Sequence, residues 1–392
     1  MAYTALVAGG GIAGSAHALA LVKAGITPVV YEAYDRTADN AGVFLTLAVN
    51  ALDALRALDL DVHDLGFDTP RITITSGSGR RLGELPYGTS RTVKRADLYR
   101  ALREEALLRG VRFEYGKRLA DAQDTADGVL ATFTDGTTAT GDLLVGADGL
   151  HSRTREIIDP DAPGARYSGL LNTGGYARGV AVDSEPGMMN ALFGRRCFMA
   201  YTAHPNGEVW WVANPPSPTE LTAITPAEWR SRLTELFRRD RGPAVDIIAA
   251  TDRIHTGWNT YDLPTMPRWH RGRMIVIGDA AHATAPSIGQ GAAMALEDAV
   301  VLAMCLRDSP DVTSAFTSYE RLRRTRVERV VEQGNRTGGW KALGPVARIP
   351  RDLIMSVAMK RMRHDPSQWI YDHHIDWHEP VSATLARSSP TH

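Results

Sequence analysis

The first 32 residues constrain the fold most strongly, because an apolar run there leads directly into three closely spaced glycines. These are Gly9, Gly11 and Gly14; a helical pattern of small residues follows them, and a second apolar run ends at Glu32. This order of strand, glycine-rich turn, helix, strand and acid is the fingerprint of a dinucleotide-binding βαβ unit. It predicts a parallel α/β sheet with a nucleotide at the N-terminus of the first helix.

Each part of this motif has a physical role in holding a dinucleotide. Gly9 and Gly11 allow a tight turn and a close approach of the backbone to a pyrophosphate, and Gly14 lets the helix pack closely on the strand. Glu32 follows Gly14 by 18 residues, which is near the spacing at which a carboxylate reaches the adenosine ribose. A glycine-rich turn in an ordinary α/β domain is the alternative, and the complete unit disfavours it.

A second motif, around residue 280, indicates another helix N-terminus that faces a ligand. An apolar run at 274–277 leads into Gly278 and Asp279, and a loop with Pro286 precedes a helix whose first amides come from 289–291. Free amides and the helix dipole favour an anion, or negative charge that develops during a reaction. Asp279 can accept hydrogen bonds from the hydroxyls of a sugar-like chain. The expected ligand therefore has hydroxyls and an electron-rich head.

The middle of the chain predicts a return to the parallel sheet and then a separate antiparallel sheet. The apolar run at 142–146 precedes Asp148, which can brace the cofactor crevice or a neighbouring loop, and Ser152 is placed to cap a helix. Residues 167–269 contain alternating apolar segments typical of strands, which could roof a pocket. The alternating segment 71–75 is expected to pair with these later strands.

Composition excludes several classes of protein. The 392 residues leave room for two domains, 44% of them are hydrophobic, and a net charge of −1 gives no support for nucleic-acid binding. The two cysteines are too few for a disulfide framework, which favours a reducing compartment. The sequence shows neither a secretory pattern nor a long apolar window. We therefore expect a cytoplasmic protein with no membrane span.

Three motifs in this order resemble the single-component FAD-dependent aromatic hydroxylases, the p-hydroxybenzoate hydroxylase-like group. They are Gly9-x-Gly11-x-x-Gly14, the Gly146-Ala-Asp148-Gly149 segment with Ser152 and Arg155, and Gly278-Asp279-Ala-Ala-His282 with Pro286 and Gly289-Gln290-Gly291. Length and loop sequence look most like the salicylate, urate and tetracycline-modifying members, and the resemblance covers roughly residues 1 to 340. The sequence departs from the family at Val49, where a proline is common, and at Ala177, where an aromatic residue precedes Arg178 in relatives.

The resemblance implies an α/β fold with a Rossmann-like FAD-binding domain of the glutathione-reductase type, an inserted and mostly antiparallel β-sheet domain for the substrate, and a C-terminal helix. The implied FAD-binding domain is discontinuous. Its parts are residues 1–70, 95–165 and 270–340, with 71–94 and 166–269 forming the substrate sheet and 341–392 a C-terminal helical segment and tail.

Most of the implied cofactor contacts come from these motifs. The first motif and Glu32 would hold the ADP half, Asp279 the ribityl chain and pyrophosphate, and the amides of 289–291 the flavin pyrimidine ring. Arg95 opens a helix, where a cation opposes the dipole, so contact with a ligand explains it better than helix stability does. Arg36 could reach a phosphate or lie on the surface. The predicted cofactor-binding residues are Gly9, Gly11, Ile12, Ala13, Gly14, Glu32, Ala33, Arg36, Arg95, Leu119, Asp148, Asp279, Pro286, Gly289, Gln290, Gly291 and Ala292.

The implied reaction is oxygen transfer. NADPH or NADH would visit transiently, because the sequence has no second glycine fingerprint, and a C4a-hydroperoxyflavin would hydroxylate or epoxidise an aromatic, polycyclic or other electron-rich small molecule with O2. The sequence identifies no catalytic acid or base. Candidate substrate residues are Arg178, Tyr201, Trp211 and Pro286, and Tyr201 and Trp211 could equally be sheet core.

Several alternatives stay open at this point. A reductase or dehydrogenase of a polyketide or prenyl-type substrate would keep the same FAD site, and so would a non-catalytic flavin-binding protein. A flavin-dependent halogenase is disfavoured, because its Trp-x-Trp-x-Ile-Pro signature is absent. No metal is expected, since His373, His374 and His378 lack a frame of carboxylates. Either a monomer or a homodimer is compatible with the sequence.

Overall fold

A six-stranded sheet forms one of the two large layers of the protein. The computed structural model describes residues 3–35, 42–221, 224–263, 265–284, 288–341, 348–361 and 367–388. The strand order of the six-stranded sheet is β18-β19-β12-β1-β2-β8. Five strands run parallel and β18 is antiparallel at the edge. The predicted parallel sheet is therefore confirmed. The strands are β1 (Thr4–Ala8), β2 (Thr27–Tyr31), β8 (Arg112–Glu114), β12 (Leu143–Gly146), β18 (His270–Arg271) and β19 (Met274–Val276).

Helices with many small residues pack closely around this sheet. Helix α1 (Ile12–Lys23) has a run of buried residues from Gly14 to Leu21, since its alanines let it contact both α8 (Gly291–Asp308) and α3 (Arg95–Leu108). Helix α2 (Val49–Ala57) also packs on α8. This packing fixes the N-termini of α1 and α8 at one end of the sheet.

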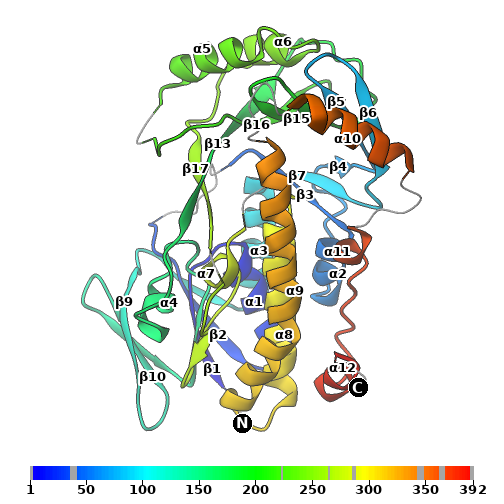
Figure 1. Ribbon diagram of the computed structural model, residues 1–392. Coiled ribbons are helices and arrows are strands. Elements are labelled where there is room, and N and C mark those ends of the chain that lie inside the picture. The colour runs from blue at the N-terminus through cyan, green and yellow to red at the C-terminus, as the bar shows by residue number, and fades with distance from the viewer. Residues whose placement is uncertain are drawn as a thin grey trace.

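A seven-stranded sheet forms the second layer, with the order β17-β13-β16-β15-β14-β5-β6. It is antiparallel except between β5 and β14, which confirms both the expected antiparallel sheet and the pairing of segment 71–75 with later strands. Helices α5 (Pro226–Phe237) and α6 (Ala244–Ala249) cover its outer face (Figure 1). The strands are β5 (Arg71–Ser76), β6 (Arg81–Pro86), β13 (Arg166–Ala177), β14 (Met189–Phe193), β15 (Phe198–Ala203), β16 (Val209–Asn214) and β17 (Trp258–Asp262).

Two smaller three-stranded sheets contact the large ones. One three-stranded sheet is β3 (Phe44–Leu47), β7 (Arg91–Lys94) and β4 (Phe67–Asp68), and another is β11 (Thr138–Gly141), β10 (Val129–Phe133) and β9 (Leu119–Asp124). Two short helices, α4 (Arg153–Ile158) and α7 (Asp279–His282), follow strands of the parallel sheet. The hydroxyl of Ser152 accepts from the Arg155 amide, which confirms the predicted N-cap of α4.

One long helix joins the layers. Helix α9 (Val312–Lys341) has 30 residues and is therefore about 45 Å long. Figure 1 shows it rising beside α8 toward the seven-stranded sheet. Helix α10 (Arg348–Arg361) then packs beside β6, and α11 (Gln368–Tyr371) and α12 (Val381–Ser388) complete the chain. Within the described ranges, no helix combines the length and apolar character needed to cross a membrane.

Candidate active site

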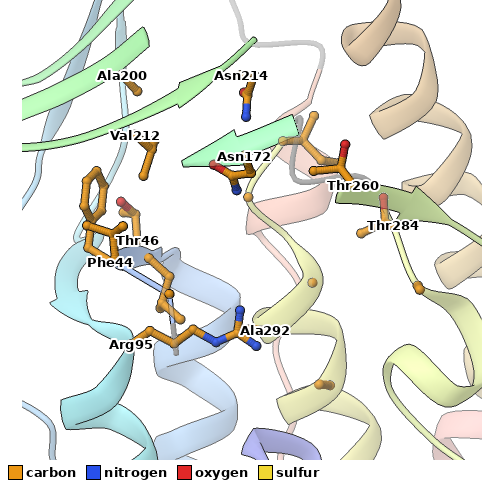
Figure 2. Close-up of a pocket in the computed structure, with 18 of the residues that line it drawn as sticks. Phe44, Thr46, Arg95, Asn172, Ala200, Val212, Asn214, Thr260, Thr284 and Ala292 are labelled. Atoms are coloured by element: carbon orange, nitrogen blue, oxygen red, sulfur yellow. The ribbon is translucent and has the colours of Figure 1, made fainter. Parts of the chain in front are cut away.

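A cavity of about 640 Å³ lies between the two large sheets, and all three sequence motifs contribute to its lining. Side chains from β3, α3, α8 and the seven-stranded sheet surround it, as Figure 2 shows. The motif residues in the lining are Gly11, Ile12, Ala13, Ala147, Gly149, Leu150, Asp279, Gly289, Gly291 and Ala292. The fold thus brings together segments that are more than 100 residues apart in the sequence.

The first glycine motif is built for close backbone contact. A Cβ added at Gly14 would lie 1.9 Å from the Gly9 carbonyl oxygen, and one at Gly9 would lie 2.4 Å from the Ala147 carbonyl oxygen. Gly9 also has a φ of +99°, which favours glycine. Gly11 is the N-cap of α1 and has no side-chain capping bond. The first amides of α1 are therefore available to an anion at the edge of the cavity.

Glu32 orders the turn of this motif. Its Oε2 accepts from the Gly10 amide at 2.7 Å and its Oε1 from the Tyr34 amide at 3.0 Å. Asp148 has a similar role, because it accepts from the Ser152 hydroxyl and from both the amide and the hydroxyl of Thr154. Of the two roles that the sequence allows for Asp148, the structure places it in the loop-bracing one.

The second helix N-terminus at the cavity belongs to α8. Helix α8 begins after Gln290, which forms no side-chain cap, and Gly289 before it has a φ of +66°. The Gln290 Oε1 accepts from Asn50 Nδ2 at 3.0 Å, whereas its Nε2 is buried without a partner among the described residues. Asp279 begins α7 and lines the cavity. Pro286 and Arg36, two of the predicted contacts, lie outside the described residues.

A cluster of buried charges links α8 to α7 and α9. Arg323 on α9 donates to Asp298 at 2.7 Å and also to Glu297, and Arg326 donates to both oxygens of Glu297 at 2.8 Å. His282 contacts Asp298 at hydrogen-bond distance. Glu297, Asp298 and Arg323 are at most 1% exposed. Because buried charges are costly unless paired, this cluster holds α7, α8 and α9 in one arrangement.

The charges in this cluster keep its carboxylates ionised. Burial would raise the pKa of Glu297, but Arg323 and Arg326 outweigh that effect and lower the pKa to about 2. Burial opposes ionisation of Asp298 too, and His282 together with Arg323 still holds its pKa below the ordinary value. His282 is thus a buried partner of Asp298 and is not among the residues that line the cavity.

We call the part of the cavity lined by the glycine motifs and the starts of α1 and α8 the cofactor side, and the part lined by the seven-stranded sheet the substrate side. Arg95 is a cation of the cofactor side, and its side chain points into the cavity. It begins α3, and its guanidinium lies 5.7 Å from the ring centre of Tyr99. Its Nε is buried and has no hydrogen-bond partner among the described residues. Figure 2 shows the side chain extending across the lower part of the cavity. An unpaired buried donor next to two helix N-termini is suited to an anionic or polar ligand.

The substrate side is mainly apolar. Its lining comes from one face of the seven-stranded sheet, and Figure 2 shows Ala200, Val212 and Asn214 on that face. The polar exceptions include Asn172, Asn214 and Lys341. The apolar lining residues of the sheet are Ile72, Ile74, Leu85, Pro86, Met189, Ala191, Phe193, Phe198, Ala200, Val212 and Trp258.

The structure places three of the predicted substrate residues away from this lining. Trp211 and Tyr201 pack with α5 and α6 instead, and the Trp211 indole donates to the Thr251 hydroxyl at 2.9 Å. Successive residues of a strand point to opposite faces, so their neighbours Val212 and Ala200 face the cavity. Arg178 lies 2.7 Å from Glu208 in an ion pair, with its side chain 74% exposed.

Several other expected contacts do not line the cavity. Leu119 is buried in β9, where it pairs with Phe133, Gly9 and Gly14 flank the lining residues of the first motif, and Ala33 follows β2. Both cysteines are buried free thiols. His374 lies 2.8 Å from Asp53, and within the described part of the chain no group of three metal-ligating side chains occurs.

The sequence did not identify most of the substrate side. Missed lining residues include Phe44, Thr46, Tyr99, Asn172, Asn214 and Lys341. For Asn214 a signal existed, because the β16 alternation assigns it to the same face as Val212. No sequence pattern marks Lys341, which reaches the cavity only because α9 is long enough.

Together, a parallel sheet with a dinucleotide fingerprint and a second helix N-terminus over a shared cavity define a flavin-dependent class of oxidoreductase. A family model described as "FAD binding domain" matches residues 2–334. The chain belongs to this family, that of the single-component FAD-dependent aromatic hydroxylases, and is an FAD-dependent monooxygenase. The fold, cofactor and reaction class that the motifs predicted are therefore confirmed.

Named relatives agree with this assignment. The chain is 33% identical to an FAD-dependent urate hydroxylase of Klebsiella pneumoniae over 83% of this chain and 87% of that protein. It is also 33% identical to the 3-amino-4-hydroxybenzoate 2-monooxygenase PtnB3 of Streptomyces platensis, over 93% and 94%. A crystal structure of Klebsiella pneumoniae HpxO complexed with FAD and uric acid is similar with a TM-score of 0.82 at 26% identity, covering 99% of this chain and 97% of that one.

The described residues fit FAD. The cradle at Gly9 and Gly14 leaves no room for a Cβ, the amides that begin α1 and α8 lack side-chain caps, and Arg95 keeps a buried donor unpaired. The acceptor that hydroxyls need is Asp279. These are the groups that a pyrophosphate, a polyol chain and a ring system that develops negative charge require.

Proposed function

We propose that this monooxygenase uses NADH or NADPH and O2 to hydroxylate or epoxidise an aromatic or polycyclic small molecule that lies under the seven-stranded sheet. The observation that supports this most is the single cavity, which extends from the glycine motifs to the apolar strands. Bound FAD supplies the redox chemistry, accepting a hydride from the nicotinamide and activating O2. The protein positions the substrate and excludes water.

The residues of the chain would each support a part of this reaction. The N-terminus of α8, at Gly291, favours negative charge on the nearby part of a reduced ring. Asp279 and Arg95 would orient the polyol and phosphate portions. The apolar strand face would keep water from the reacting atoms. No described side chain is needed as an acid or base when the substrate is a phenol or enol that ionises itself.

Relatives indicate the size of substrate to expect. Urate and 3-amino-4-hydroxybenzoate, which appear in the names of two relatives, are planar and electron-rich rings. The cavity of about 640 Å³ has the size of sites that bury small ligands. We retain the division into an FAD-binding part and an inserted substrate sheet as part of this proposal. A cytoplasmic location, and a monomeric or homodimeric state, stay predictions.

The test is the visible spectrum of the purified holoprotein, recorded without oxygen in the presence of NADH or NADPH and a panel of phenols, indoles and polyketide-like aromatics. We expect one compound to accelerate bleaching of the flavin. After air is admitted, the colour should return and the product should be heavier by one oxygen atom.

Two other results would contradict the proposal. A product heavier by two hydrogen atoms, with no added oxygen, would indicate a reductase. Bound flavin that neither nucleotide bleaches with any compound would favour a non-catalytic flavin-binding protein. Reconstitution with FAD before the assay ensures that a partly loaded preparation is not mistaken for either result.

A further inference from the structure

The substrate side of the cavity contains one basic side chain with no acidic partner. Lys341 is the last residue of α9, and its Nζ lies 3.2 Å from Asn214 Oδ1 and 4.0 Å from the ring centre of Phe198. The other charged residues among the described lining are Arg95 and Asp279, on the cofactor side. Within the described part of the chain Lys341 forms no ion pair. The amine therefore faces an apolar space with only a neutral acceptor and an aromatic ring.

Such an arrangement is costly for the protein alone. Taking an ammonium group out of water disfavours its charged form, and burial lowers the pKa of Lys341 to about 7. A lysine normally extends its flexible stem so that the amine stays in water. Here the amine points instead toward Asn214 on the sheet, so a ligand with negative charge would supply the missing partner.

A second, independent group points to a ligand at the same place. Asn172 on β13 is 9% exposed, lines the cavity, and its Oδ1 is buried with no hydrogen-bond partner among the described residues. Figure 2 shows Asn172 and Asn214, which come from the neighbouring strands β13 and β16, projecting into the space above Arg95. An unpaired buried acceptor requires a donor. A ligand that satisfies both groups has an anionic oxygen and, elsewhere on its ring, an N–H or O–H.

We propose that Lys341 and Asn214 bind an anionic oxygen of the substrate, and that the substrate is a planar aromatic acid with a carboxylate or an acidic phenolic oxygen. This rests on the proposed function, since it assigns the substrate class of that same cavity. The ring lies against the apolar face that includes Phe198 and Val212, and Asn172 accepts from a donor on the ring. Lys341 is thus a specificity-determining residue.

The groups around Lys341 allow a pH test. Arg351 on α10 lies 5.1 Å from the ring of Phe193, and Arg95 and Asp279 lie on the cofactor side. Tyr87, Tyr99, Tyr261 and Tyr371 are the phenols of the lining, and burial raises the pKa of Tyr87 to about 12. An aromatic carboxylic acid stays ionised above pH 6. Its affinity should therefore fall as the pH rises through 7 in the free holoenzyme, by up to about tenfold per pH unit, because the amine loses its proton.

The main test compares matched ligands by calorimetric titration of the FAD-loaded protein at pH 6.5. Benzoate is paired with benzamide, and 4-nitrophenol with 4-nitroanisole, so that the two pairs separate a carboxylate site from a phenolate site. The variants are Lys341→Met, Lys341→Arg and the control Arg336→Met, which removes a 69% exposed cation from the same helix. The ratio of FAD to protein shows whether each variant is folded.

We expect the wild type and Arg336→Met to bind one of the two acids at least about tenfold more tightly than its neutral partner. Lys341→Met should reduce this ratio to less than about threefold, and Lys341→Arg should keep part of it. An unchanged ratio in Lys341→Met overturns the proposal, and so does a wild type that binds the neutral probes equally well or binds none of the four at millimolar concentration. If Lys341→Met does not bind FAD, the pH profile of the wild type decides.

These results are separable from a failure of the proposed function, because binding does not require turnover. A protein that prefers the acid but forms no oxygenated product would contradict only the proposed function. One that oxygenates neutral aromatics and shows no preference for acids would contradict only this inference.

Discussion

The cofactor side and the substrate side of the cavity are built on different principles. The cofactor side consists of turns in which a Cβ would clash with backbone, and of buried charges that pair with one another. The substrate side is an apolar strand face with one amide, Asn172, whose Oδ1 has no partner among the described residues, and one lysine, Lys341, without an acidic partner there. The cofactor side is therefore held mainly by close packing and paired charges, although Arg95 Nε and Gln290 Nε2 remain unpaired there among the described residues. The substrate side has little polar structure of its own and depends more on its ligand.

This difference separates what the two sides can tolerate. Changes on the cofactor side disturb packing or buried charge, so we expect losses of stability and of FAD. Changes on the substrate side should alter which ligand binds while the fold persists. The following predictions test this contrast, beginning with the largest expected effect.

Replacing Arg323 by Met should destabilise the protein more than any of the substitutions that follow. Glu297 and Asp298 would keep Arg326 and His282 as partners but lose the central cation. Removing one partner of a buried pair costs about 3–5 kcal/mol. Chemical denaturation of the holoprotein measures the change, and Arg336→Met is the control because its ion pair is exposed. If the free energy of unfolding falls by less than about 1 kcal/mol, the cluster does not contribute substantially to the stability of the cofactor side.

His17 should make the protein sensitive to mild acid. It lies between α1 and α8, where its Nδ1 donates to the Ala299 carbonyl at 2.9 Å and its Nε2 is buried without a partner in the described structure. Burial lowers the pKa of His17 to about 4, so the folded state holds it neutral while the unfolded chain protonates it near pH 6.5. The unfolded state then binds more protons, and stability is lost as the pH falls from about 6.5 to 4.

The size of this loss is about 3 kcal/mol across that range. The free energy of unfolding of His17→Gln should therefore depend less on pH between 7 and 4.5 than that of the wild type. If the variant does not fold, NMR titration of the wild-type imidazole measures the pKa directly. A normal histidine pKa would contradict the prediction.

Gly14→Ala should reduce FAD affinity without a comparable effect on the substrate sheet. The added Cβ would lie 1.9 Å from the Gly9 carbonyl oxygen, so α1 must move away from the turn. Overpacking of this kind costs about 1–3 kcal/mol, which corresponds to about fivefold to 150-fold in affinity if the apoprotein folds. Fluorescence titration of apoprotein with FAD measures it. Gly164→Ala is the matched control, since its Cβ would meet no atom within 4 Å.

The two sides also differ in how far the sequence predicts them. The sequence identified the glycine motifs and Asp279 because the spacing of these residues is required by a local turn or by the start of a helix. In the structure, residues of these motifs line one cavity. The seven-stranded sheet could be predicted as antiparallel strands from its alternation. The sequence could not predict which face of that sheet contacts the ligand, because either face of an apolar strand can pack in the core.

The errors on the substrate side follow from this physical limit. Large aromatic residues suggested that Trp211 faces the substrate, but its size suits the densely packed side under α5 and α6. The neighbouring Val212 faces the cavity instead. The sequence did not predict that Lys341 lines the cavity, because the position of Lys341 depends on the length and direction of α9. Such a contact is a property of the whole fold and of no local pattern.

Arg178→Ala should have the smallest effect of these substitutions. It tests the sequence-based hypothesis that Arg178 contacts the substrate, which the structure does not support. The side chain is 74% exposed, lies outside the cavity lining and pairs with Glu208 at 2.7 Å. Solvent screens the exposed guanidinium, so the pair contributes about 0–1 kcal/mol although the Glu208 side chain is only 12% exposed. Stability should therefore change little, and the affinity for benzoate or 4-nitrophenol less than about twofold. Lys341→Met, measured in the same titrations, should change the affinity for the preferred acid by about tenfold. A larger effect for Arg178→Ala than for Lys341→Met would reverse the assignment, and would mean that the substrate approaches from the outer edge of the sheet.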